Sequence, residues 1–200
     1  MPLSKIFYMK KIIFSDKYGL TQAVLEGRKT VTRRIIPREF FTLMWDIDDD
    51  TLVCENIRNS KYAKYKLGEV VAVAQNYKDC GGFENGIPRW DIIANKVGAT
   101  SAGWTNKMFV RADLMPHRIR ITNVRVERLQ DISDEDCLRE GIEEHLKGVQ
   151  YGFTSNIGYV GQYPFTTPRE AFALLIDKIS GKGTWESNPW VFVYEFKLID

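Results

Sequence analysis

The stretch Arg118–Leu129 (RIRITNVRVERL) constrains the fold of this chain more than any other, because its hydrophobic pattern changes phase partway along. Ile119 and Ile121 alternate with arginines, which is the two-residue period of a half-buried strand. The two valines that follow alternate in the opposite phase, and the change falls at Thr122–Asn123. A one-residue slip within a strand is typical of a β-bulge or bend. Bends of this kind let a small sheet curl towards a barrel.

Further strands and helices are predicted on both sides of this strand. Short β-prone or apolar runs predict strands over residues 10–14, 68–74 and 190–198. Helical spacing and capping residues predict helices over 20–26, 133–140 and 167–180. These elements follow one another without regular helical crossovers. We therefore expect an α+β fold with a small mixed sheet rather than a doubly wound sheet.

Two stretches rich in glycine and aromatic residues interrupt this order. We expect a single domain over residues 1–200, with long loop insertions at about 76–114 and 145–166. The acidic run Asp46–Asp50 has neither the glycine nor the closing glutamate of a calcium-binding EF-hand loop, which favours a solvated turn.

Composition excludes several classes of protein. The net charge of +2 is too small for a dedicated duplex-binding domain, so any electrostatic site must be local. The cysteines, Cys54, Cys80 and Cys137, form no CxxC pair, and the two histidines lie far apart. We expect free thiols, no metal site and no cofactor. The N-terminus lacks the apolar core of a signal peptide and no segment is long enough to cross a bilayer, which predicts a cytoplasmic protein without membrane partners.

The segment Glu26–Arg34 (EGRKTVTRR) is the first candidate for a functional site, and we expect it to form a short loop after a helix that Gly27 ends. Its closely spaced cations repel one another unless an anion or polar ligand lies among them. Lys29 precedes Thr32 by three residues. Together the two supply a base and a hydroxyl group, which are the parts of an activated nucleophile. On a strand this spacing would put them on opposite faces, whereas a turn would bring them together. An ordinary solvated basic turn is the structural alternative.

Three motifs in the same order resemble the ASCH domain family, a branch of the PUA-like β-barrel superfamily. The resemblance runs from Lys10 to the C-terminus, apart from the two loop regions. Its motifs are a glycine followed by K-x-x-T-x-R at Gly27, Lys29, Thr32 and Arg34, then R-x-x-R-L at Arg125–Leu129 with a capped turn and Glu-Gly over Ser133–Gly141, and a closing strand at Asn188–Phe196.

This resemblance implies a PUA-like small mixed or antiparallel β-barrel with a few packed helices and two long loop insertions. The Met115–Pro116 pair before the long strand resembles the Met-Pro pair of a longer ASCH subgroup, which is common in phage and prophage proteins. That subgroup usually carries Arg-Glu at the end of the second strand, where this chain has Ala74–Gln75. The difference removes a charge pair from a wall of the expected ligand cleft.

The resemblance also implies an activity, because a small bacterial member of the family removes the acetyl group from N4-acetylcytidine. By this likeness Thr32 is the expected nucleophile, Lys29 takes its proton, and Glu140 orients Lys29 or passes a proton to the leaving amine. Arg34 would hold an anionic or carbonyl oxygen of the ligand. The expected ligand-binding residues are Arg33, Arg34, Gln75 and Trp190. A Lys29–Glu140 salt bridge that only closes the barrel mouth is the structural alternative.

The second hypothesis is an RNA-binding or modified-nucleotide-binding module without catalysis, since single-stranded RNA is bound through stacking aromatics and cations. The insertions offer the aromatic residues Tyr77, Phe83, Trp90, Trp104, Tyr151, Phe153, Tyr159 and Tyr163. The long strand offers the arginines Arg118, Arg120, Arg125 and Arg128, which the phase change divides between two faces. Such aromatics also serve to pack a long loop onto the body of a protein. The expected partner is therefore a nucleoside or an RNA.

Overall fold

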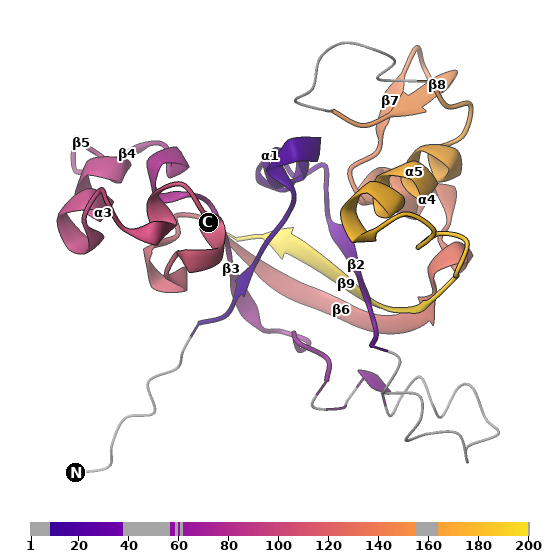
Figure 1. Cartoon of the computed structure of the whole chain (residues 1–200), viewed down its shortest axis with the longest axis horizontal. Helices are drawn as coiled ribbons and strands as arrows, with labels where there is room; N and C mark the ends of the chain where they lie inside the picture. The colour runs from indigo at the N-terminus through magenta and orange to yellow at the C-terminus, as the bar shows by residue number, and fades with distance from the viewer. Residues whose placement is uncertain (1–8, 38–56, 59, 61, 155–163, 200) are drawn as a thin grey trace. The chain divides into compact units, whose positions relative to one another are not determined.

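The computed structural model describes residues 9–37, 57–58, 60, 62–154 and 164–199, and in them the chain is a mixed α+β protein (Figure 1). The described α-helices are α1 (Leu20–Leu25), α3 (Arg89–Val97), α4 (Asp134–Arg139) and α5 (Pro168–Ser180). The strands are β1 (Lys11–Ile12), β2 (Val31–Ile35), β3 (Val70–Val73), β4 (Phe83–Glu84), β5 (Ile87–Pro88), β6 (Arg118–Arg128), β7 (Glu143–His145), β8 (Gln150–Gly152) and β9 (Trp190–Leu198). The expected α+β class is confirmed. The acidic run 46–50, Cys54, Tyr159 and Tyr163 lie outside the described residues.

The principal sheet has five strands in the hydrogen-bonded order β1-β3-β6-β9-β2. It is mixed, because β1 pairs with β3 in parallel while β3 pairs with β6, and β2 with β9, in antiparallel fashion. In the β2–β9 pair, Thr32 lies opposite Tyr194 and Arg34 lies opposite Phe192. No closed barrel is found among the residues that the structure describes.

Strand β6 confirms the change of phase predicted from its sequence. Ile119 and Ile121 are buried, the next buried residue is Val124, and Thr122 and Asn123 between them are exposed. The strand therefore turns a different set of side chains towards the interior after residue 123, as a bend or bulge does.

The chain divides into two compact units, and β6 contributes to both. The first unit comprises Met1–Phe14, Val70–Arg120 and Leu198–Asp200, and the second comprises Ser15–Glu69 and Ile121–Lys197. The single-domain expectation stays a prediction.

The first unit contains the whole of the expected insertion at 76–114, which is more regular than its sequence suggested. Strands β4 and β5 form a hairpin whose turn residues, Asn85 and Gly86, have φ of 53° and 78°. Asn-Gly is the pair that such two-residue turns favour. Helix α3 follows at once, and Ile93 from α3 packs into a core of this unit. That core consists of Ala72, Ala74, Tyr77, Cys80, Ile93, Val110, Ala112, Leu114 and Met115.

The second unit contains the two helices whose capping signals were read from the sequence. The hydroxyl oxygen of Ser133 accepts a hydrogen bond from the backbone N–H of Asp136, and that of Thr167 accepts one from Glu170. The two helices, α4 and α5, contact each other (Figure 1). Phe172 of α5 is buried, and burial of such a side chain contributes roughly 1.5–3 kcal/mol.

Strand β2 corrects the expectation of a loop over residues 28–34. Only 28–30 lack regular structure, and Val31–Ile35 form a strand paired with β9 along its whole length. Two adjacent arginines, Arg33 and Arg34, suggested a solvated turn. Arg33 instead lies buried, because carboxylates from distant parts of the chain neutralise its charge.

Candidate functional site

The candidate site begins at Lys29, whose side chain is turned inwards by the way α1 ends. Helix α1 stops at Leu25, and Gly27 takes a positive φ of 73°, which glycine adopts without strain. The backbone N–H of Lys29 then donates to the carbonyl of Ala23 at 2.9 Å, which holds the chain against the helix end. The Lys29 residue is only 2% exposed.

The ammonium group of Lys29 is held by Glu140, which lies 111 residues further along the chain. Lys29 Nζ donates to the backbone oxygen of Glu140 at 2.7 Å and also to its carboxylate oxygen Oε2. Glu140 is the residue at which α4 ends, and its own N–H donates to the carbonyl of Asp136 at 2.8 Å. The structure thus brings together two of the three residues expected to be catalytic.

The backbone conformation and the close packing at position 141 explain why a glycine follows Glu140. The φ of Gly141 is 104°, a conformation that other residues adopt only with strain. A Cβ atom at this position would lie 3.0 Å from Cδ2 of Leu20 and 3.7 Å from Cδ of Lys29. Glycine therefore lets the end of α4 approach both α1 and the lysine stem.

Arg33 joins Lys29 to a larger set of charges. Its guanidinium donates to Glu140 at 3.2 Å, to Glu127 at 2.6 Å and to Asp136 at 2.9 Å. These partners come from the end of β6 and from α4, so the three elements are tied together at one buried cation. Arg33 was expected to bind ligand. In this structure its guanidinium donors are directed at protein carboxylates.

The same carboxylates also bind Arg125 and Arg139, which completes what we call the ion-paired cluster. Its cations are Lys29, Arg33, Arg125 and Arg139, and its carboxylates are Glu127, Asp136, Glu140 and Glu195. Four positive groups face four negative groups, so the cluster is balanced in charge. A buried ion pair is tolerated when its partners are hydrogen-bonded in this way, and removal of one partner is strongly destabilising.

Burial and neighbouring charges shift the pKa values of this cluster in opposite directions. Burial lowers the pKa of Lys29, and this effect exceeds the raising effect of the Glu140 charge. Burial alone would raise the pKa of Asp136, but the hydrogen bond from Arg33 and the nearby arginine charges hold it below its ordinary value. The hydrogen bond from Arg139 lowers the pKa of Glu195. A buried lysine with a lowered pKa is a recognised form of general base.

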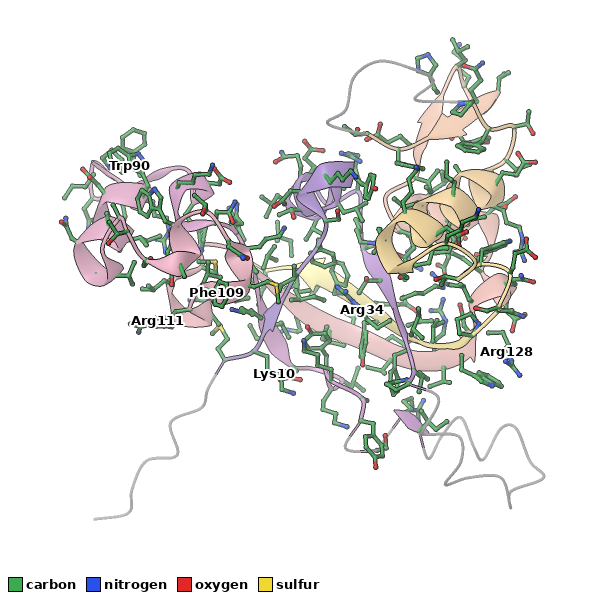
Figure 2. The ribbon with its side chains drawn as sticks, in the orientation of Figure 1. Lys10, Arg34, Trp90, Phe109, Arg111 and Arg128 are labelled. Carbon is green, nitrogen blue, oxygen red and sulfur yellow. The ribbon has the colours of Figure 1, made fainter. Side chains whose placement is uncertain are left out.

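The side chain of Thr32 points to the face of β2 opposite that of Arg33, because neighbouring residues of a strand point to opposite faces. Thr32 is buried, and Tyr194 is its partner in β9. Arg34 shares the face of Thr32 and extends from β2 (Figure 2). Lys29 precedes the strand, and the charges of both Arg34 and Arg33 lower its pKa. The ammonium is therefore within electrostatic range of groups on both faces.

The two remaining expected ligand residues lie in different units. Trp190 begins β9 in the second unit, is half-buried, and has the guanidinium of Arg128 at 4.5 Å from its ring centroid. Gln75 follows β3 in the first unit, and its buried side-chain oxygen has no hydrogen-bond partner among the described residues. The assignment of these residues to a ligand stays a prediction.

Sequence reasoning missed most of the ion-paired cluster. It named Arg125 only as part of a basic surface stripe, whereas the structure pairs Arg125 with Glu127, Asp136 and Glu195. Arg118, Arg120 and Arg128 of the proposed stripe are exposed. The signal lay in the R-x-x-R-L and capped-turn motifs, which supply Arg125 and the acidic residues of α4.

The aromatic residues of the insertions differ in exposure. Phe83 is 75% exposed and Trp90 44%, whereas Tyr77 is buried in the core of the first unit and Trp104 packs against that core. Figure 2 labels Trp90 on α3. Phe153 is buried and packs edge-on against Tyr18. Tyr151 in β8 is half-buried, so Phe83 and Trp90 are the exposed members of this set among the described residues.

Comparison with models of protein families, with curated proteins and with solved structures finds no match. In the part of the chain that the structure describes, no helix is long and apolar enough to cross a membrane. The same residues contain no group of three or more His, Cys, Asp or Glu able to hold a metal ion. Cys80 and Cys137 are free thiols, and burial raises their pKa to about 11 and about 12.

Proposed function

We propose that this chain is an ASCH-family protein with a PUA-like barrel, and that it hydrolyses the amide of an acylated nucleoside such as N4-acetylcytidine. The observation that carries the proposal is the buried contact between Lys29 and Glu140. The two residues are 111 positions apart, and both were singled out by motifs of the family. A contact between them is what the proposed chemistry requires.

The proposed reaction begins at Thr32. Its hydroxyl oxygen forms a bond to the acetyl carbonyl carbon while Lys29 takes the hydroxyl proton. The tetrahedral intermediate then collapses, the bond from carbon to N4 breaks, and N4 receives a proton from Lys29. Water next hydrolyses the acetyl-threonine ester, which releases acetate and restores the hydroxyl. Throughout, Glu140 holds the Lys29 side chain.

Two properties of Lys29 support the role of base. Its burial lowers its pKa, so a larger fraction of the amine is neutral at a given pH than for an exposed lysine. Its position is held by two bonds to Glu140, which is held in turn by Arg33. A base whose rotamer is locked by surrounding contacts needs no further ordering before it takes a proton.

The decisive experiment is turnover of N4-acetylcytidine by the purified chain, followed by the ultraviolet change on loss of the acetyl group. We expect turnover by the wild type and its loss in Lys29→Met, which keeps most of the lysine stem. Thr32→Val should also abolish turnover, because it keeps the shape of threonine and removes the hydroxyl. Thr32→Ser should retain part of it.

A matched control is Thr21→Val. Thr21 is another buried threonine of the same unit, and its hydroxyl donates to Asp16 at 2.5 Å. This substitution should lower stability and leave turnover per folded molecule unchanged. Full activity of Thr32→Val would exclude the covalent mechanism, and an inactive wild type would exclude the amidohydrolase.

A binding module without catalysis is the second candidate, and the exposed Phe83 and Trp90 favour it. Both lie near Arg89, but that guanidinium is paired with Glu84 at 2.5 Å, which weakens its attraction for phosphate. If the wild type is inactive, Trp90→Ala should reduce affinity for a single-stranded RNA oligonucleotide. An unchanged affinity would exclude this surface as an RNA site.

A further inference from the structure

Among the residues that the structure describes, the hydroxyl group of Tyr194 has no hydrogen-bond partner, although Tyr194 is only 1% exposed. Tyr194 lies in the middle of β9, among the most thoroughly buried residues of the second unit. Buried polar groups in native proteins are nearly always hydrogen-bonded, and the exceptions often mark a place where a ligand or water binds. A tyrosine is also an unusual choice for a purely apolar position, because phenylalanine fills the same space without the hydroxyl.

The surroundings of Tyr194 are aromatic on one side and contain hydrogen-bond donors on the other. The ring of Tyr65 lies edge-on at 5.2 Å between centroids, and the ring of Phe192 is stacked at 5.9 Å. Burial raises the pKa of Tyr194, and the backbone N–H groups of Tyr65 and Lys64 partly counteract this. Those N–H groups are therefore near the hydroxyl, although neither makes a hydrogen bond of normal geometry to it.

Thr32 and Arg34 lie on the same side of the sheet as Tyr194. Thr32 is the direct partner of Tyr194 in the antiparallel β2–β9 pair, and Arg34 is two residues further along β2. Side chains that are paired across a ladder, and side chains two residues apart in a strand, share one face. Burial raises the pKa of both Tyr65 and Tyr194, the positive charge of Arg34 opposes this rise, and the negative charge of Glu69 adds to it. We call Thr32, Arg34, Tyr65 and Tyr194 the tyrosine cluster.

The tyrosine cluster gathers donors and positive charge. A phenol hydroxyl and a guanidinium donate, and nearby backbone N–H groups add to the positive potential. The four members of the cluster include no carboxylate, in contrast to the ion-paired cluster, although the charge of Glu69 acts on both tyrosines. The group that best fits such surroundings is an oxygen acceptor that gains negative charge, next to a small apolar group that the aromatic rings accommodate.

We propose that the Tyr194 hydroxyl, together with Arg34, binds the carbonyl oxygen of the acyl group and stabilises the oxyanion that forms there. This inference rests on the proposed amidohydrolase function. When Thr32 Oγ bonds to the carbonyl carbon, the π electron pair of the carbonyl moves onto its oxygen. Tyr194 and Arg34 hold that oxyanion. When the pair returns to re-form the carbonyl, the bond from carbon to N4 breaks.

The test is Tyr194→Phe, which removes one oxygen atom and keeps the ring. We expect kcat for N4-acetylcytidine to fall on the order of 10²-fold, the loss typical of removing one oxyanion donor. The variant should fold as well as the wild type, because the hydroxyl has no partner in the part of the chain that the structure describes. Tyr18→Phe is the matched control. Tyr18 is another buried tyrosine of the second unit, and this change should leave kcat unchanged.

A second readout separates this inference from the proposed function. The affinities of wild type and Tyr194→Phe for N4-acetylcytidine and for cytidine are compared by calorimetry, which requires no turnover. If the wild type is inactive but Tyr194→Phe weakens binding of the acetylated nucleoside alone, the proposed function fails and the acyl-oxygen site stands. An active wild type whose kcat is unaffected by Tyr194→Phe overturns the inference alone. A wild type that neither turns over nor binds the acetylated nucleoside overturns both.

Discussion

The two faces of the β2–β9 strand pair are built on opposite principles. On one face the ion-paired cluster satisfies each buried charge with a partner, and four cations meet four carboxylates. On the other face the tyrosine cluster leaves the Tyr194 hydroxyl without a partner. A satisfied network holds its members in place, whereas an unsatisfied donor is ready for a ligand. Under the proposed function, the first face holds the base in place and the second receives the substrate.

The largest expected effect comes from breaking the ion-paired cluster at Glu140. Glu140→Gln removes the charge that faces both Lys29 and Arg33, and leaves two buried cations with one carboxylate fewer. We expect the free energy of unfolding to fall by about 3–5 kcal/mol, as for other buried pairs that lose one partner. Urea unfolding measures this. Glu135→Gln on the exposed side of α4 is the control and should change stability by less than about 0.5 kcal/mol. A similarly small loss of unfolding free energy in both variants would show that the ion-paired cluster does not stabilise the fold.

The close approach at Gly141 should give the next largest effect. Gly141→Ala combines a backbone strained at a φ of 104° with a Cβ 3.0 Å from Leu20, and we expect a loss of about 2 kcal/mol. Gly27→Ala is the matched control, because its φ is also positive at 73° but no atom lies within 4 Å of the added Cβ. It should lose about 1 kcal/mol. Equal losses in the thermal unfolding of the two variants would exclude a role for the contact with α1.

The carboxylates of the cluster should make stability depend on pH in the acid range. The folded pKa of Asp136 lies below its ordinary value of 3.8, so the unfolded chain takes up its proton first as the pH falls. The stabilisation is therefore complete above that ordinary value and is lost as the pH falls through the folded pKa. Asp136→Asn should flatten this dependence.

The measurement is the urea midpoint at several pH values between neutral and strongly acid. Lys29 has the same sign at alkaline pH, since its folded pKa is lowered from 10.5 and stability should rise with pH up to that value. Lys29→Met should remove the alkaline rise and leave the acid slope. An unchanged acid slope in Asp136→Asn would assign the dependence to other groups.

The smallest expected effect is on the stability of Tyr194→Phe. Because its hydroxyl has no partner, we expect a change within about 0.5 kcal/mol in thermal unfolding. Tyr77→Phe sharpens the comparison, because the Tyr77 hydroxyl accepts a hydrogen bond from the backbone N–H of Arg111 at 2.8 Å. Its loss leaves a part-buried donor without this acceptor and should lower stability by about 1–2 kcal/mol. A loss at Tyr194 as large as that at Tyr77 would mean that its hydroxyl is already satisfied in the folded chain.

Local signals allowed much of the fold to be read before the structure. Ser133 and Thr167–Pro168 begin their helices where the capping rules place them, and the phase change in β6 falls at residues 122–123. The Asn85–Gly86 hairpin carried an equally clear signal that was overlooked. The pairing of Lys29 with Glu140 was expected only from the family resemblance.

By itself, then, the sequence determined helices α1, α4 and α5, the long strand and the closing strand, but not α3, because caps and periodicity act between residues close along the chain. Only the tertiary structure decided that Val31–Ile35 form a strand, since Arg33 becomes buried through carboxylates 94 to 107 residues away. The tertiary structure also decided that Thr32 shares a face of the sheet with Tyr194, because the register of β2 with β9 places the two residues opposite each other. Charge neutralisation and strand register both depend on partners distant in the chain, and no local pattern specifies them.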